Sequence, residues 1–73
     1  MISGKTALEL ISMARSGASL EVDGGSYTTA ELTAIVKELS GSARLRILNS
    51  DKISAIDCSG IANAAPSGHV EFA

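Results

Sequence analysis

The sequence predicts an α/β fold of three helix-strand repeats, with a parallel three-stranded sheet in sequential order and all helices on one face. Two observations support this prediction. The same pattern occurs three times: a Ser or Thr, a carboxylate three residues later, a small hydrophobic cassette, and a short strand of alternating apolar and charged residues. The copies also begin 22 and 26 residues apart, at positions 6, 28 and 54. Self-similarity at a period of about 20–50 residues is typical of solenoids, in which each unit contacts only its neighbours.

Each repeat begins with the residues of a helix cap. The caps are Thr6, Thr28 and Ser54, followed by the carboxylates of Glu9, Glu31 and Asp57. The hydroxyl of such a cap accepts a hydrogen bond from an amide at the helix start, and the carboxylate accepts one from the cap's own amide. The negative charge also interacts favourably with the positive end of the helix dipole. Since Asp57 stands where Glu or Gln is usual, we expect the third capping box to be the weakest.

The residues after each cap place apolar side chains on one face of a helix. The three faces are Leu10, Met13 and Ala14; Leu32, Ile35, Val36 and Leu39; and Cys58, Ile61, Ala62 and Ala65. Spacings of three and four residues predict amphipathic helices that pack against a core. We expect the helices to end at the Ser-Gly pairs 16–17, 40–41 and 67–68, because glycine readily adopts the left-handed conformation of a helix C-terminus.

A short strand follows each helix. Residues 20–22, 45–47 and 70–72 each place a charged residue between two apolar ones, which predicts half-buried strands. Strands connected through a helix run parallel. Stacking the repeats in order would place Glu21, Arg46 and Glu71 in one row on the outer sheet face, and Ser19, Arg44 and His69 in the next row. Opposite charges on neighbouring strands would then select the register.

The 73 residues are expected to form one domain, with repeats at about 4–25, 26–50 and 51–73. A chain of this length buries only about 60% of its unfolded surface, so its stability is expected to be marginal. The expected core is Leu10, Met13, Ala14, Leu20, Val22, Leu32, Ile35, Val36, Leu45, Ile47, Cys58, Ile61, Val70 and Phe72.

Composition argues against several classes of function. A net charge of -2 and 3% aromatic residues do not suit nucleic-acid binding, which needs a basic patch and stacking surfaces. No stretch is long and apolar enough to span a bilayer, and residues 1–5 lack the apolar core of a secretion signal, so we expect a cytoplasmic protein with no membrane partner. One cysteine and one histidine leave no disulfide and no metal-ligand cluster, and we expect no cofactor.

A segment in the second half of the chain carries a family resemblance. Residues 45–61, which include Ile56-Asp57-Cys58-Ser59-Gly60-Ile61, resemble the strand, loop and helix start of STAS domains, the fold of anti-sigma-factor antagonists. Residues 20–23 and 28–32 are similar to that family's preceding strand and helix. The resemblance implies that Cys58 occupies the position of the phosphorylated Ser, whose state decides whether a kinase or a sigma-factor regulator is bound. The family begins with a strand, whereas residues 1–17 here predict a helix.

Cys58, His69 and Asp57 could in principle act as a nucleophile, a base and an orienting group. The repeat instead places Cys58 in register with Leu10 and Leu32, in the core. It also assigns Asp57 to a helix cap and His69 to the outer sheet face. A small enzyme is therefore the third alternative.

The most favoured function is a non-catalytic module for protein-protein interaction or self-assembly. An open sheet has two edges with unpaired backbone groups, and we expect no later helix to cover Phe72. The candidate interface is therefore His69, Val70, Glu71 and Phe72, and its partner is a second copy or another protein. The alternative is a STAS-like regulatory switch at Cys58. A helix at the start of the chain favours the repeat, and a strand there favours the switch.

Overall fold

The computed structural model describes residues 4–73. Its elements are α1 (Ala7–Arg15), β1 (Leu20–Asp23), α2 (Thr29–Lys37), β2 (Leu45–Leu48), the 3-10 helix η1 (Ser50–Lys52), α3 (Ala55–Ala64) and β3 (Val70–Phe72). The predicted alternation of helix and strand is confirmed, and the first described element is a helix. Residues 1–3, which entered the expectation about a secretion signal, lie outside the described residues. The 3-10 helix was not predicted, because the polar sequence of residues 49–52 indicates only a turn.

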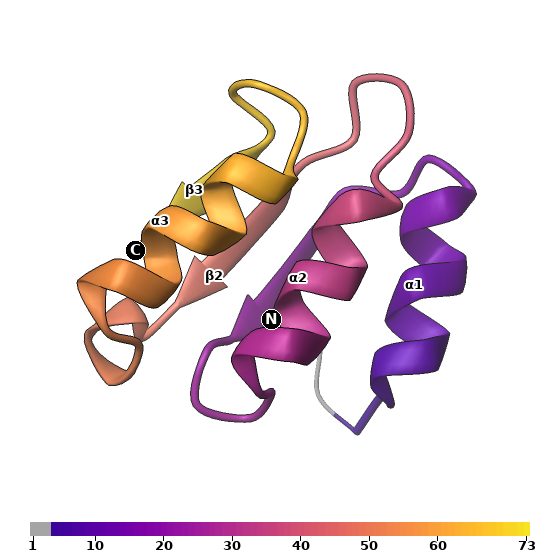
Figure 1. The fold of residues 1–73 in the computed structure, drawn as a ribbon. Coiled ribbons are helices and arrows are strands. Elements are labelled where there is room, and N and C mark those ends of the chain that lie inside the picture. Colours follow the sequence, from indigo (N-terminus) through magenta and orange to yellow (C-terminus); the bar gives the residue numbers. More distant parts are fainter. Residues whose placement is uncertain (1–3) are drawn as a thin grey trace.

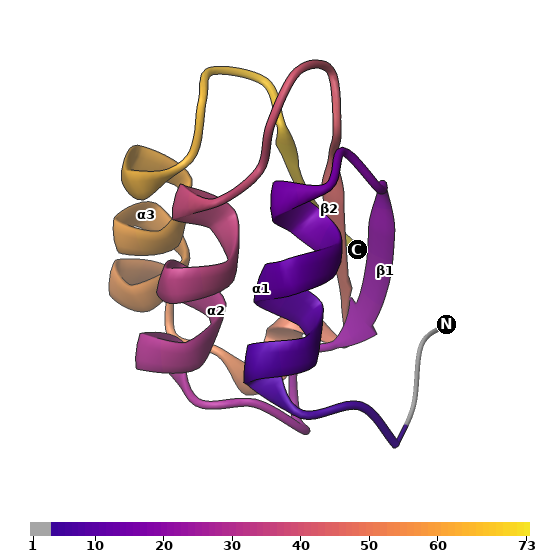
Figure 2. The same cartoon turned by 90° about the vertical axis from the view of Figure 1, so that its right-hand side faces the viewer.

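The helices and the strands form two layers. The three strands are parallel and lie in the order β1-β2-β3. Figures 1 and 2 show the helices side by side on one face of this sheet, in the same order, with α2 packed between α1 and α3. The sheet is open, with β1 and β3 at its edges. The predicted α/β class, strand order and one-sided helix layer are confirmed.

The register of the strands is the one predicted from their alternation. Leu20, Leu45 and Val70 lie side by side across the sheet, as do Glu21, Arg46 and Glu71. The backbone hydrogen bonds of the sheet extend one residue before the strands. The amide of Leu20 donates to the carbonyl of Arg44, and the amide of Leu45 donates to the carbonyl of His69, both at 2.8 Å. Ser19, Arg44 and His69 therefore form the second predicted row.

The helix caps differ in the way the sequence predicts. Thr6 and Thr28 each begin a complete capping box, in which the hydroxyl accepts from the N3 amide and the N3 carboxylate accepts from the cap amide. At α3 the hydroxyl of Ser54 accepts from the amide of Asp57 at 3.2 Å. The Asp57 carboxylate instead accepts from the Thr29 hydroxyl on α2 at 3.2 Å, and within residues 4–73 the return bond to Ser54 is absent.

Two of the three predicted helix ends are wrong. Gly17, with φ of 93°, follows α1 as expected. Helix α2 stops earlier, at Lys37, because the amides of Glu38 and Leu39 donate to carbonyls three residues back, a tighter winding that ends an α-helix. Helix α3 stops at Ala64 because the residue before Pro66 is driven out of the helical region. Gly41 and Gly68, the glycines of the other two Ser-Gly pairs, lie instead in the turns that follow these helices.

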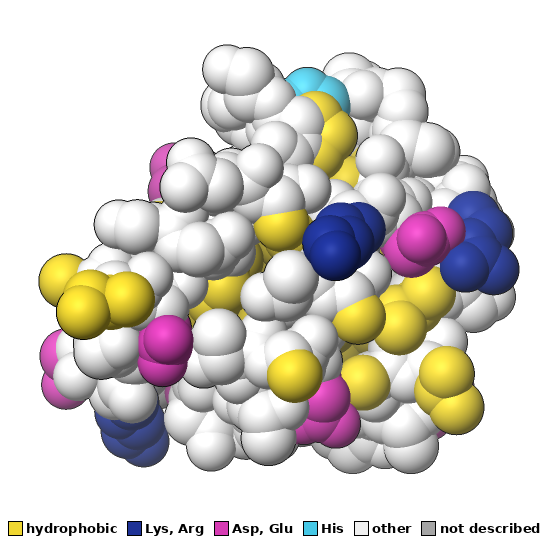
Figure 3. Space-filling model, in the orientation of Figure 1, with side chains coloured by type: hydrophobic (Ala, Val, Ile, Leu, Met, Phe, Trp, Pro, Cys, Tyr) yellow, Lys and Arg dark blue, Asp and Glu magenta, His cyan; other side chains and the backbone are white. Residues whose placement is uncertain are grey.

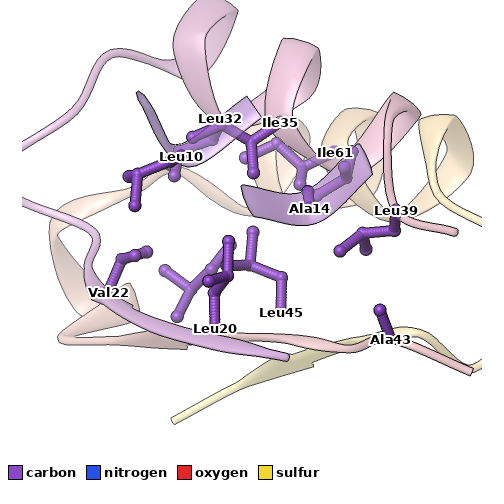
Figure 4. Close-up of a cluster of buried hydrophobic side chains, with 12 residues drawn as sticks. Leu10, Ala14, Leu20, Val22, Leu32, Ile35, Leu39, Ala43, Leu45 and Ile61 are labelled. Atoms are coloured by element: carbon purple, nitrogen blue, oxygen red, sulfur yellow. The ribbon is translucent and has the colours of Figure 1, made fainter. Parts of the chain in front are cut away.

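The core lies between the helix layer and the sheet. Figure 4 shows buried side chains of the helices lying over those of the strands. The buried apolar residues are Leu10, Ala14, Leu20, Val22, Leu32, Ile35, Val36, Leu39, Ala43, Leu45, Ile47 and Ile61. Four expected core residues are only partly buried: Met13, Cys58, Val70 and Phe72. They belong to the outermost helices and the edge strand, where a neighbouring repeat covers one side only. Leu39 and Ala43 complete the core from the loop after α2.

Candidate functional site

The outer face of the sheet carries a row of alternating charges. The Arg46 guanidinium lies between two carboxylates, with Nη1 3.2 Å from Glu21 Oε2 and Nε 3.0 Å from Glu71 Oε1. All three predicted residues of the row thus meet in the structure. Because the side chains are 37–69% exposed, the ion pairs select the register and contribute little to stability.

A second row runs across the start of the strands. Ser19 Oγ accepts a hydrogen bond from the Arg44 amide at 3.2 Å, which adds a side-chain contact between the residues that precede β1 and β2. Arg44 is exposed and makes no ion pair within residues 4–73. The Nδ1 atom of His69 is buried, and it has no hydrogen-bond partner in that part of the chain. This row is therefore less fully paired than the charge row beside it.

The two rows border a shallow hollow of about 310 Å³ on the outer face. Its lining comes from all three strands and the residues that precede them: Ser19, Leu20, Glu21, Arg44, Leu45, Arg46, Gly68, His69, Val70 and Glu71. The hollow thus contains every predicted outer-face residue and three of the four predicted interface residues.

Strand β3 is the least covered strand of the sheet. The inward side chains of β1 and β2 are buried, with Leu45 and Ile47 fully so, whereas Val70 and Phe72 remain partly exposed. The His69 carbonyl and the Ala73 amide both bond to β2 at 2.8 Å. Backbone groups of successive residues alternate in direction along a strand, so those of Val70 and Phe72 point away from β2. No strand within residues 4–73 lies on that side.

The opposite, helix-covered face has a second hollow of about 430 Å³ between α1 and α2, lined by Ile11, Arg15, Ala30, Thr33, Ala34, Lys37 and Glu38. Two large side chains are strongly exposed there, Leu8 at 78% on α1 and Ile56 at 84% on α3. These are the two outermost helices of the layer. In Figure 3 the hydrophobic side chains of this face are scattered among polar ones.

Cys58, Asp57 and His69 are not assembled as a catalytic set. Cys58 is partly buried on α3, with Sγ 3.9 Å from the Ile53 carbonyl. Asp57 bonds to Thr29, and His69 lines the hollow on the outer face of the sheet. Within residues 4–73 no group of three or more His, Cys, Asp or Glu side chains could hold a metal ion.

A polar connection between the first two repeats was not predicted. Asp23 Oδ1 accepts from the Asn49 side chain at 2.9 Å and from the Gly25 amide at 3.1 Å, and Oδ2 accepts from the Ser26 hydroxyl at 3.1 Å. Led by the bond from Asn49, these contacts hold the pKa of Asp23 below its ordinary value. The sequence signal here is the polar composition of residues 23–26 and 49–52, which indicates turns but no contact between them.

No protein-family model matches this chain, and no curated protein or solved structure gives a significant match. In the described part of the chain, none of the helices has the length and apolar character that crossing a bilayer requires. The helix at the start of the described chain is the outcome that favours the repeat over the switch. The STAS resemblance itself, with Cys58 at its switch position, stays a hypothesis.

Proposed function

We propose that this protein is a non-catalytic protein-protein interaction module that binds an extended segment by strand addition at β3. The observation that carries the proposal is that no strand within residues 4–73 pairs with the outer side of β3, and that this strand is only partly covered. Val70 and Phe72 direct their backbone groups away from the sheet, and their side chains are only partly buried. An added strand would pair these backbone groups and cover both side chains at once.

Strand addition obtains its affinity from main-chain hydrogen bonds and its specificity from alternate side chains. The edge of β1 is a weaker candidate. Its inward side chains, Leu20 and Val22, are already buried at 5% and 0% exposure. A strand added at β1 would therefore gain hydrogen bonds but would bury little further apolar surface at these positions, whereas one added at β3 would gain both.

The proposal can be tested with a displayed library of extended eight-residue peptides selected against the natural chain. Val70→Pro removes the amide that faces the open edge, and proline is tolerated on an edge strand where that amide makes no ladder bond. Val70→Thr keeps the amide and a β-branched side chain, so it is the matched control. Unchanged melting temperatures would show that both variants fold.

Selected peptides should bind the natural chain and Val70→Thr, lose binding to Val70→Pro, and slow the amide exchange of Val70 and Phe72. The proposal is wrong if no peptide is selected. It is also wrong if the selected peptides bind Val70→Pro equally well and leave both amides unprotected.

A further inference from the structure

The charge row ends at β3 on a carboxylate. Across the sheet the row reads Glu21, Arg46, Glu71, and Arg46 is shared between its two neighbours. Glu71 is the most exposed member, at 69%. Its outer side faces the place that a fourth strand would occupy, so the next charge in the row has to come from whatever binds there.

The register fixes what a parallel fourth strand would present at each position. The residue beside Glu71 would lie on the outer face, and its two neighbours in sequence would point inward, because side chains alternate along a strand. Those inward neighbours would extend the apolar rows that end at Val70 and Phe72. The fitting sequence is therefore an apolar residue, a charged residue, and a second apolar residue.

Resting on the proposed function, we infer that the β3 edge selects an extended segment of another protein with Lys or Arg opposite Glu71 and an apolar residue on each side. Opposite charges directly across neighbouring strands are favourable and like charges are unfavourable. The same arrangement already holds within the sheet, where Arg46 lies between Leu45 and Ile47 on β2 and pairs with both flanking carboxylates.

A second copy of this chain does not meet the requirement. Of its three strands, the one with the apolar-basic-apolar sequence is β2, which lies inside the sheet. The strand that another copy could offer in parallel register is β1, the other edge strand, which carries Glu21. Head-to-tail stacking would therefore set Glu21 of one copy beside Glu71 of the next.

The inference can be tested with two eight-residue peptides that differ only at the centre, Val-Lys-Val in one and Val-Glu-Val in the other. Binding is measured by fluorescence anisotropy for the natural chain, Glu71→Lys and Glu38→Lys. The last variant makes the same change in charge at the residue that follows α2, away from the sheet, so it controls for net charge. The two peptides should differ in affinity for the natural chain by about 2- to 30-fold in favour of lysine. Glu38→Lys should keep this order, and Glu71→Lys should reverse it.

Each failure has its own signature. Equal affinity for both peptides, with Val70 and Phe72 protected from exchange, overturns the choice of a basic residue and leaves strand addition standing. An unchanged preference in Glu71→Lys has the same meaning. If neither peptide binds or protects these amides, strand addition fails and the inference fails with it. Sedimentation of the natural chain should show a monomer, and self-association that protects Val70 and Phe72 would make a second copy the occupant and overturn the inference.

Discussion

Replacing Gly24 with alanine tests how closely the repeats pack. A Cβ atom at this position would lie 2.9 Å from Ile53 Cδ1, 3.0 Å from Ile47 Cγ2 and 3.1 Å from the Leu48 carbonyl oxygen. Ile53 Cδ1 is the end of a side chain and can move. Ile47 is fully buried in β2, and the Leu48 carbonyl accepts the Gly24 amide at 2.8 Å, so neither yields without a shift of the strand end.

Overfilling of a packed site costs about 1–3 kcal/mol, and the lower entropy of the unfolded alanine chain offsets about 0.4–1 kcal/mol of this. We therefore expect Gly24→Ala to lower the free energy of unfolding by about 0.5–2 kcal/mol. In a domain of this size, 1 kcal/mol corresponds to a melting shift of about 4–8 °C.

Gly25→Ala is the matched control, since its Cβ would meet the Lys52 side chain, with Cδ at 2.7 Å, and Lys52 is exposed and free to turn away. Urea denaturation of the two variants measures the difference directly. Equal unfolding midpoints for Gly24→Ala and Gly25→Ala would refute the close packing of the turn against β2.

Three further changes have expected outcomes. Gly60 lies in the exposed interior of α3 with open space around its missing Cβ, so Gly60→Ala should raise the free energy of unfolding by about 0.5–1 kcal/mol; a lower melting temperature would contradict this. Thr28→Ala removes a complete capping box and should cost about 0.5–2 kcal/mol, more than Lys37→Ala on the exposed side of the same helix, and calorimetry that finds equal melting shifts would count against these helix boundaries. The pKa of Asp23 is lower in the folded than in the unfolded chain, so its stabilising effect is present at neutral pH and is lost as pH falls below about 4 towards the folded pKa. Urea midpoints at pH 7 and pH 3 should therefore differ less for Asp23→Asn than for the natural chain, and an equal difference would show that Asp23 does not contribute.

The strands and their register were predictable because they depend on a local, period-two pattern. One charged residue between two apolar ones assigns each side chain to a face, and the order of charges then aligns the strands. The charge row of Glu21, Arg46 and Glu71 follows from these two facts alone. Its ion pairs were therefore the part of the candidate site that sequence reasoning reached most securely.

The remaining features depend on neighbours that no local pattern describes. Val70 and Phe72 have the same alternation as the buried strands, yet an edge position leaves them partly exposed. The bond from Asn49 to Asp23 joins residues 26 positions apart through two turns, and the backbone of Asn49 is left-handed, with φ of 57°. The ends of α2 and α3 were misplaced because a glycine indicates a turn without indicating where the preceding helix stops.

The state of the β3 edge is measured most directly by amide hydrogen exchange in the free chain and in the presence of the Val-Lys-Val peptide. In the free chain, the amides of Val70 and Phe72 should exchange rapidly although they lie in a strand, whereas the Glu71 amide, which faces β2, should be protected. Saturating peptide should slow Val70 and Phe72 and leave Glu71 unchanged. Protection of Val70 and Phe72 in the dilute free chain, or exchange that saturating peptide does not alter, would contradict a free edge that binds an added strand.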